Sequence, residues 1–304
     1  MSEARGGKIH DLGYQRYAGS KLSTGRRWRV IVRHQIATAW RTWWRFKSAM
    51  FVAIIISFIA GGLLYIASDN TIRSLGRVGG NDMALKFADG VIPLAMTWYH
   101  RAAFLASLTI GASIIASDQQ SGAFTLYFAR SVRPRDYLAG KLGALIVLTA
   151  ILVLAGPILL AGLRLGLCED STELVATLPV LGKVLALGGI ATIVYAVVPL
   201  GFSALATDRR YALAIFAAYY LVVGSMALVI SFASPNGSDF AALDIPTALE
   251  RITFQLFDVQ FLRGKHADIS LTSAVVSLIA HVVGALGIAT WRVRALRDGN
   301  VGAQ

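Results

Sequence analysis

Residues 48–67 read SAMFVAIIISFIAGGLLYIA, a run in which only serine and tyrosine hydroxyl groups are polar. A helix of about 20 apolar residues is long enough to cross the roughly 30 Å hydrocarbon core of a bilayer. This stretch therefore predicts a membrane span, and five further apolar runs follow it. The six predicted spans cover about residues 48–67, 91–117, 142–163, 184–205, 211–232 and 271–290.

The composition of the whole chain agrees with this prediction. Of the 304 residues 56% are hydrophobic and only 15% are charged, whereas soluble domains carry about 25% charged residues. The mean hydropathy is +0.61. The net charge of +12 does not indicate nucleic-acid binding, because the basic residues lie at the ends of apolar runs. A single cysteine, Cys168, excludes an intrachain disulfide framework.

The distribution of basic residues predicts the orientation. Of the 29 lysine and arginine residues, 20 fall in residues 1–47, the insert after the second span, the turn after the fourth, and the segment from Trp291. Cytoplasmic segments are enriched in lysine and arginine. We therefore expect a multi-pass protein of the plasma (inner) membrane with both termini in the cytoplasm. Residues 1–25 and 295–304 are expected to be cytoplasmic tails, the first of them flexible.

Residues 26–47 are amphipathic at helical spacing, with aromatic and apolar side chains on one face and arginines on the other. Tryptophan and arginine side chains together are typical of a helix that lies in the membrane interface. The alternative is a cytoplasmic helix that packs on another subunit. The candidate interfacial residues are Trp28, Arg33, Trp40, Arg41, Trp43 and Trp44.

The second predicted span contains two ionisable residues, His100 and Arg101. Ionisable side chains inside a membrane are costly and usually functional, so this pair is a candidate intramembrane site. Alternatively the helix starts near Phe104, and the pair extends to the outer interface.

The sequence lacks the motifs of several classes of protein. The chain has no phosphate-binding loop of the form GxxxxGK[ST], so it is not expected to be an ATPase itself. Five scattered histidines predict no metal site, and no GxSxG nucleophile motif occurs. No span carries a pair of carboxylates, which argues against a proton- or sodium-coupled transporter. We expect no enzymatic activity and no bound cofactor in this chain.

The insert between the second and third spans covers residues 116–141 and is polar to amphipathic. Residues 122–129 can form a short helix with an aromatic surface. Pro134 suits the first turn of a second helix, and Asp136 lies near the positive end of that helix. Such an insert is either a surface on which a cytoplasmic protein docks or an ordinary loop.

The order of these parts resembles the membrane subunit of ABC-2 type exporters. Members carry an amphipathic elbow helix, six spans with both ends inside, and a cytoplasmic coupling helix after span two. Asp118 and Gly122 match a motif of many members at the end of span two, and Gly140-Lys141 matches one leading into span three. The intervening Ser131-Val-Arg-Pro-Arg135 departs from the family pattern, because its proline is displaced and its arginine is shifted by one position.

The resemblance implies a permease within residues 26–294 that works as a homodimer or with a related permease. It would lie in the lipid bilayer and bind a separate ABC ATP-binding subunit, which holds ATP and Mg²⁺. In the family the two permease copies meet largely through spans one and five, and a segment before span six, matched here by residues 246–261, helps to close the exit. The residues expected to couple to the ATPase are Asp118, Gly122, Phe124, Tyr127, Arg130, Arg133, Arg135, Asp136 and Lys141. Two alternatives stay open: a membrane enzyme that acts on lipid through His100 and Arg101, and an assembly factor without transport activity.

Overall fold

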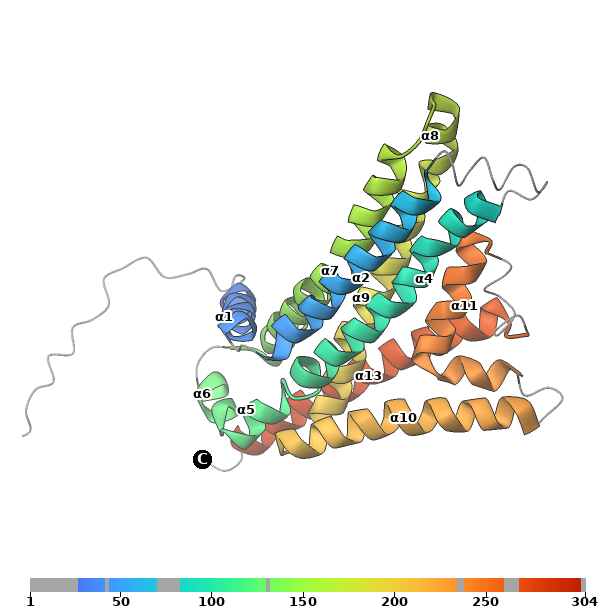
Figure 1. Ribbon diagram of the computed structural model, residues 1–304. Coiled ribbons are helices and arrows are strands. Elements are labelled where there is room, and N and C mark those ends of the chain that lie inside the picture. Colours follow the sequence, from blue (N-terminus) through green and yellow to red (C-terminus); the bar gives the residue numbers. More distant parts are fainter. Residues whose placement is uncertain are drawn as a thin grey trace, which may run out of the picture.

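The computed structural model describes residues 27–41, 44–69, 83–129, 132–233, 238–259 and 268–301. All regular secondary structure in these ranges is helical (Figure 1). Six of the helical segments are long and apolar enough to cross a membrane. The prediction of an all-α, multi-pass membrane protein with six spans is therefore confirmed.

The elements follow one another along the chain in a simple order. They are α1 (Arg27–Arg41), α2 (Arg45–Ala67), α4 (Met83–Ala106), the π-helix η2 (Ser107–Gly111), α5 (Ala116–Gln120), α6 (Ala123–Ala129), α7 (Pro134–Gly166), α8 (Ser171–Thr177), α9 (Pro179–Leu205), α10 (Arg209–Ala233), the 3-10 helix η3 (Ser238–Leu243), α11 (Ile245–Phe257) and α13 (Leu271–Val301).

The helices extend beyond the predicted spans, because an apolar run fixes the part within the membrane and not the helix ends. The third spanning helix begins at Pro134 instead of residue 142, so part of the polar insert is continuous with it. The sixth runs to Val301, so part of the tail predicted at 295–304 is helical. The amphipathic helix predicted at 26–47 is shorter, because α1 ends at Arg41 and α2 already begins at Arg45.

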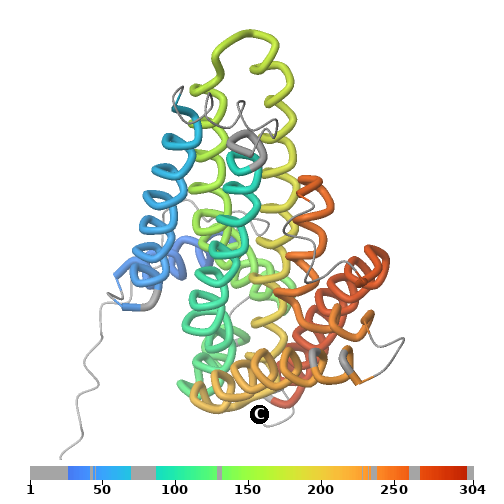
Figure 2. Tube along the Cα trace, turned by 45° about the vertical axis from the view of Figure 1, so that its right-hand side comes forward, coloured from blue at the N-terminus to red at the C-terminus, as the bar shows by residue number. Residues whose placement is uncertain are grey.

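Four spanning helices, α2, α4, α7 and α9, run side by side (Figures 1 and 2). Helix α10 crosses their direction at one end of the bundle, and α13 is inclined between α9 and α10. The same end carries α5, α6 and the end of α13, whereas α8 lies at the opposite end. Among the six spans α10 is the least buried.

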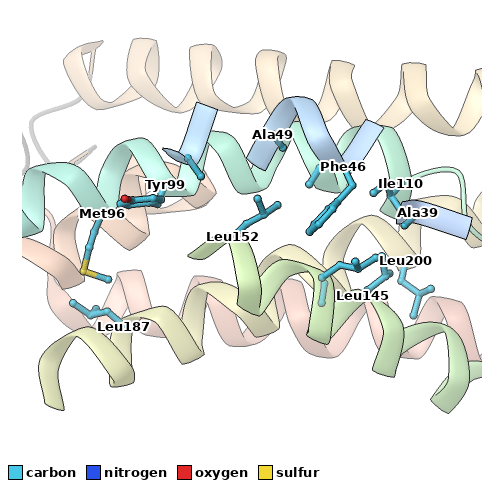
Figure 3. Close-up of a cluster of buried hydrophobic side chains, with 14 of the residues drawn as sticks. Ala39, Phe46, Ala49, Met96, Tyr99, Ile110, Leu145, Leu152, Leu187 and Leu200 are labelled. Carbon is cyan, nitrogen blue, oxygen red and sulfur yellow. The ribbon is translucent and has the colours of Figure 1, made fainter. Parts of the chain in front are cut away.

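The largest buried cluster lies between α2, α4, α7 and α9 (Figure 3), with Phe46, Met96, Tyr99 and Leu152 among its members. Small residues let these helices approach closely, as is usual in membrane bundles. The Tyr99 ring fills the space beside Gly156, where a Cβ atom would overlap it. The Tyr99 hydroxyl is also 2.6 Å from the Ser57 hydroxyl, which ties α4 to α2.

The segment matched at 246–261 contains α11, which packs against α4 and α13. Its inner face buries Ala248, Leu249, Thr253 and Phe254. Asp244 caps its first turn by accepting a hydrogen bond from the Thr247 backbone N–H at 3.1 Å. The segment between spans five and six therefore contributes side chains to the level of the spans.

Candidate functional site

The insert folds as the sequence predicts locally: a short helix, a break, and a second helix. Helix α5 ends at a bend in which Gly122 has a φ of +68°, a conformation that glycine adopts without steric cost. Helix α6 follows, and Pro134 occupies the first turn of α7 after the extended Arg133. The insert is thus continuous at both ends with helices that span the membrane.

A buried ion pair joins the two ends of the insert. Lys141 Nζ lies 2.8 Å from Asp118 Oδ2, with the lysine side chain only 4% exposed and the aspartate 16%. The Tyr137 hydroxyl donates to the same Asp118 oxygen at 2.8 Å. Lys141 also donates to Gln35 Oε1 on α1 at 3.2 Å. Charge-assisted hydrogen bonds of this length are among the strongest hydrogen bonds in proteins. Lys141 therefore links the third span to both the second span and α1.

Aromatic rings surround this ion pair. The buried Tyr137 ring lies 5.1 Å from the Phe124 ring, 5.4 Å from the Tyr127 ring and 6.4 Å from the Phe128 ring, measured between centroids. These separations are typical of favourable aromatic pairs. Burial raises the pKa of the Tyr127 hydroxyl, and the Asp118 carboxylate raises it further. Helix α6 is therefore packed onto the start of α7.

Helix α1 crosses α7 at a glycine. A Cβ atom on Gly140 would lie 2.6 Å from Ile31 Cβ and 3.1 Å from the Trp28 carbonyl oxygen. One turn further, a Cβ on Gly143 would lie 3.2 Å from a methyl group of Val32. The apolar face of α1 thus packs on α7 of the same chain. Trp40, Trp44, Arg33 and Arg41 remain exposed, and Trp43 lies outside the described residues.

The end of α9 and the short turn that follows it also hold the insert. Gln120 Nε2 donates to Asp208 Oδ2 at 2.9 Å. The backbone N–H groups of Ile115 and Ala116 donate to the Ser203 hydroxyl at 2.8 and 3.1 Å. These bonds satisfy backbone donors where the second span changes from π-helix to α5.

The basic residues predicted to couple to a partner divide into two groups. Lys141 is buried in the ion pair, whereas Arg133 and Arg135 are exposed at the start of α7. Asp136 is half-buried, and Arg130 lies outside the described residues. The exposed arginines form a surface available to another protein.

His100 and Arg101 lie in the middle of a continuous helix, so a helix start near Phe104 is wrong. Neighbouring helix residues point about 100° apart, and the two side chains have different surroundings. His100 is 2% exposed, and neither ring nitrogen has a hydrogen-bond partner among the described residues. The Arg101 side chain is 58% exposed, stacks 4.5 Å from the Trp98 ring, and lies 3.9 Å from Glu250 of α11.

A third basic side chain lies near the opposite end, beside a polar cavity of about 500 Å³. Arg164 is 6% exposed and bonds Glu173 at 2.9 Å, with Asp89 at 3.8 Å. Glu173 accepts a further hydrogen bond from the Glu169 backbone N–H at 3.0 Å. The charge of Arg164 is therefore balanced by carboxylates from α4 and α8.

Sequence reasoning missed three residues that the structure brings into these sites. Gln35 reaches Lys141 from α1 across 106 positions. Gln120 binds the α9–α10 turn. Glu250 approaches Arg101 from a segment between spans, although the spans themselves carry no carboxylate pair. Only helical periodicity on α1, on which Gln35 lies beside Ile31, could have indicated the first of these contacts.

No protein-family model matches the chain, and no curated protein matches it significantly.

Proposed function

We propose that this protein is the permease subunit of an ATP-driven ABC-2 type exporter of the plasma membrane. The proposal rests on the ion pair between Asp118 and Lys141 and on the hydrogen bond from Lys141 to Gln35. Together they join α1, the insert and the first turns of α7. A protein that pushes on α6 would displace the ends of spans two and three together. This is what transmission of force from an ATPase to a membrane pathway requires.

The energy source would be a separate subunit, because the sequence has no phosphate-binding loop. That subunit would bind ATP and Mg²⁺ and contact α6 with the exposed Arg133 and Arg135. Positive residues gather at the end that carries the insert, which supports a cytoplasmic position for this end. Both termini would then lie in the cytoplasm.

The permease would act as a dimer of this chain or with a related one. Helices α2 and α10 expose large apolar side chains, among them Phe51 and Phe58 on α2, and Leu221 and Val229 on α10. These faces would meet a second permease around the pathway, with lipid covering the remainder.

The proposal is tested by purifying the tagged protein from its own cells in mild detergent and measuring ATPase activity. We expect an ABC ATPase to co-purify with the wild-type chain. The double variant Arg133→Glu with Arg135→Glu should lose the ATPase, because charge reversal at an interface repels the partner. Lys183→Gln at the opposite end is the matched control and should retain it. A wild-type preparation without any ATPase would refute the proposal.

A further inference from the structure

An apolar groove runs along the outside of the bundle between α2 and α4. Its volume is about 510 Å³, within the roughly 300–1,000 Å³ of small-molecule sites. Phe87, Leu94 and Trp98 line it on α4, and Val52 and Ile59 on α2. From Phe87 to Trp98 the helical rise of 1.5 Å per residue gives a length of about 16 Å. The lining contains only apolar and aromatic residues and glycine.

A positive charge stands at one end of this groove. Arg101 lies one turn beyond Trp98, and its guanidinium lies over the Trp98 indole at 4.5 Å. The groove therefore passes from an apolar channel to an aromatic ring and then to a cation. This is the order of chemical groups that an amphiphile with an apolar tail and an anionic head would match.

The guanidinium has unused capacity for hydrogen bonds. Its nearest carboxylate oxygen, on Glu250, is 3.9 Å away, longer than the 2.7–2.9 Å usual for a charge-assisted bond. Arginine carries five N–H donors, and Arg101 makes no hydrogen bond within the part of the chain that the structure describes. Arg164 in the third span differs, because two carboxylates balance it and its side chain is buried.

The position of Arg101 makes its exposure costly. It lies near the middle of the spanning segment Phe87–Gln120, where an arginine that faces hydrocarbon is strongly unfavourable. A bound anion offsets part of this penalty by supplying acceptors for the exposed donors.

We propose that the groove between α2 and α4, together with Arg101, binds an anionic lipid, with one acyl chain along the groove and the headgroup on the guanidinium. Trp98 lies at the junction between the acyl chain and the headgroup of the lipid. Glu250 competes for the same cation and keeps the site from holding its ligand irreversibly. The site stands independently of the exporter proposal, since it needs no partner subunit.

The test is native mass spectrometry of the protein taken from nanodiscs that contain equal amounts of phosphatidylglycerol and phosphatidylcholine. We expect the wild type to retain phosphatidylglycerol preferentially. Arg101→Gln should weaken that retention roughly tenfold, the factor of about one charge-assisted hydrogen bond, and Arg101→Lys should keep much of it. Val52→Trp fills the groove from an exposed position and should weaken retention of both lipids.

Arg297→Gln is the control, because Arg297 is exposed on α13 away from the groove. Each variant is first checked for a single symmetric peak on size exclusion, and Arg101→Met, which also removes the charge, takes the place of Arg101→Gln if that variant fails to fold. Unchanged lipid retention in Arg101→Gln overturns the assignment of the headgroup. Unchanged retention in Val52→Trp overturns the assignment of the acyl chain.

Discussion

Lys141 and Arg101 are both basic residues inside membrane-spanning segments, and the chain surrounds them in opposite ways. Lys141 is 4% exposed, with a carboxylate at 2.8 Å and an amide oxygen at 3.2 Å. Arg101 is 58% exposed, and its only close carboxylate among the described residues is at 3.9 Å. A charge with built-in partners holds helices together, whereas a charge with open donors is available to a ligand. The same residue class thus serves structure at one site and binding at the other.

The largest expected effect comes from breaking the buried pair. Lys141→Met leaves the Asp118 carboxylate buried without its partner, which should lower the free energy of unfolding by about 3–5 kcal/mol. Titration with SDS in mixed micelles measures this change.

The control for that experiment is the double variant Asp118→Asn with Lys141→Met, which contains no unpaired charge. It should be more stable than Lys141→Met alone, because the two positions interact directly. Equal stability of Lys141→Met and the wild type would show that the pair does not hold the insert.

A smaller effect is expected where α1 crosses α7. Gly140→Ala places a methyl group within 2.6 Å of Ile31 Cβ, and overpacking of this kind costs about 1–3 kcal/mol. We expect a lower melting temperature and faster proteolysis before α1. Gly162→Ala in the same helix is the control, because a Cβ there meets no atom within 4 Å. If both variants behave alike, the close approach of α1 to α7 does not contribute to the stability of the protein.

The smallest effect on stability is expected at the longer ion pair, between Arg101 and Glu250. Glu250→Gln should change the free energy of unfolding by about 0–1 kcal/mol, since a long, partly exposed ion pair contributes little. The same variant should raise the retention of phosphatidylglycerol, because the competing carboxylate is gone. Native mass spectrometry and SDS titration on one preparation measure both quantities. A large loss of stability would mean that Arg101 is held like Lys141, and the comparison between them would fail.

The six spans could be predicted from sequence because length and apolarity decide them locally. Asp118 and Lys141 were selected through their resemblance to a family motif, but their pairing was not predicted, since it depends on how the insert folds back. The packing of α11 against α4 and α13 could not be predicted, because its amphipathic pattern fits a membrane surface and a packed bundle equally well. Glu250 was missed because its neighbour Arg101 lies 149 positions away, and only tertiary packing brings the two together.

The π-helical turn at Ser107–Gly111 has a consequence for both sites. Its Ala112 N–H donates to the Ser107 carbonyl at 2.8 Å, one residue further than in an α-helix. One extra residue rotates everything after it by about 100° relative to everything before it. The part of the second span before the π-helical turn directs Arg101 to the outer groove. The part after it directs Asp118 inward to Lys141. Turn residues 112–115 follow the π-helix before α5 begins, so the π-helix and this turn together set the angle between the lipid site and the insert.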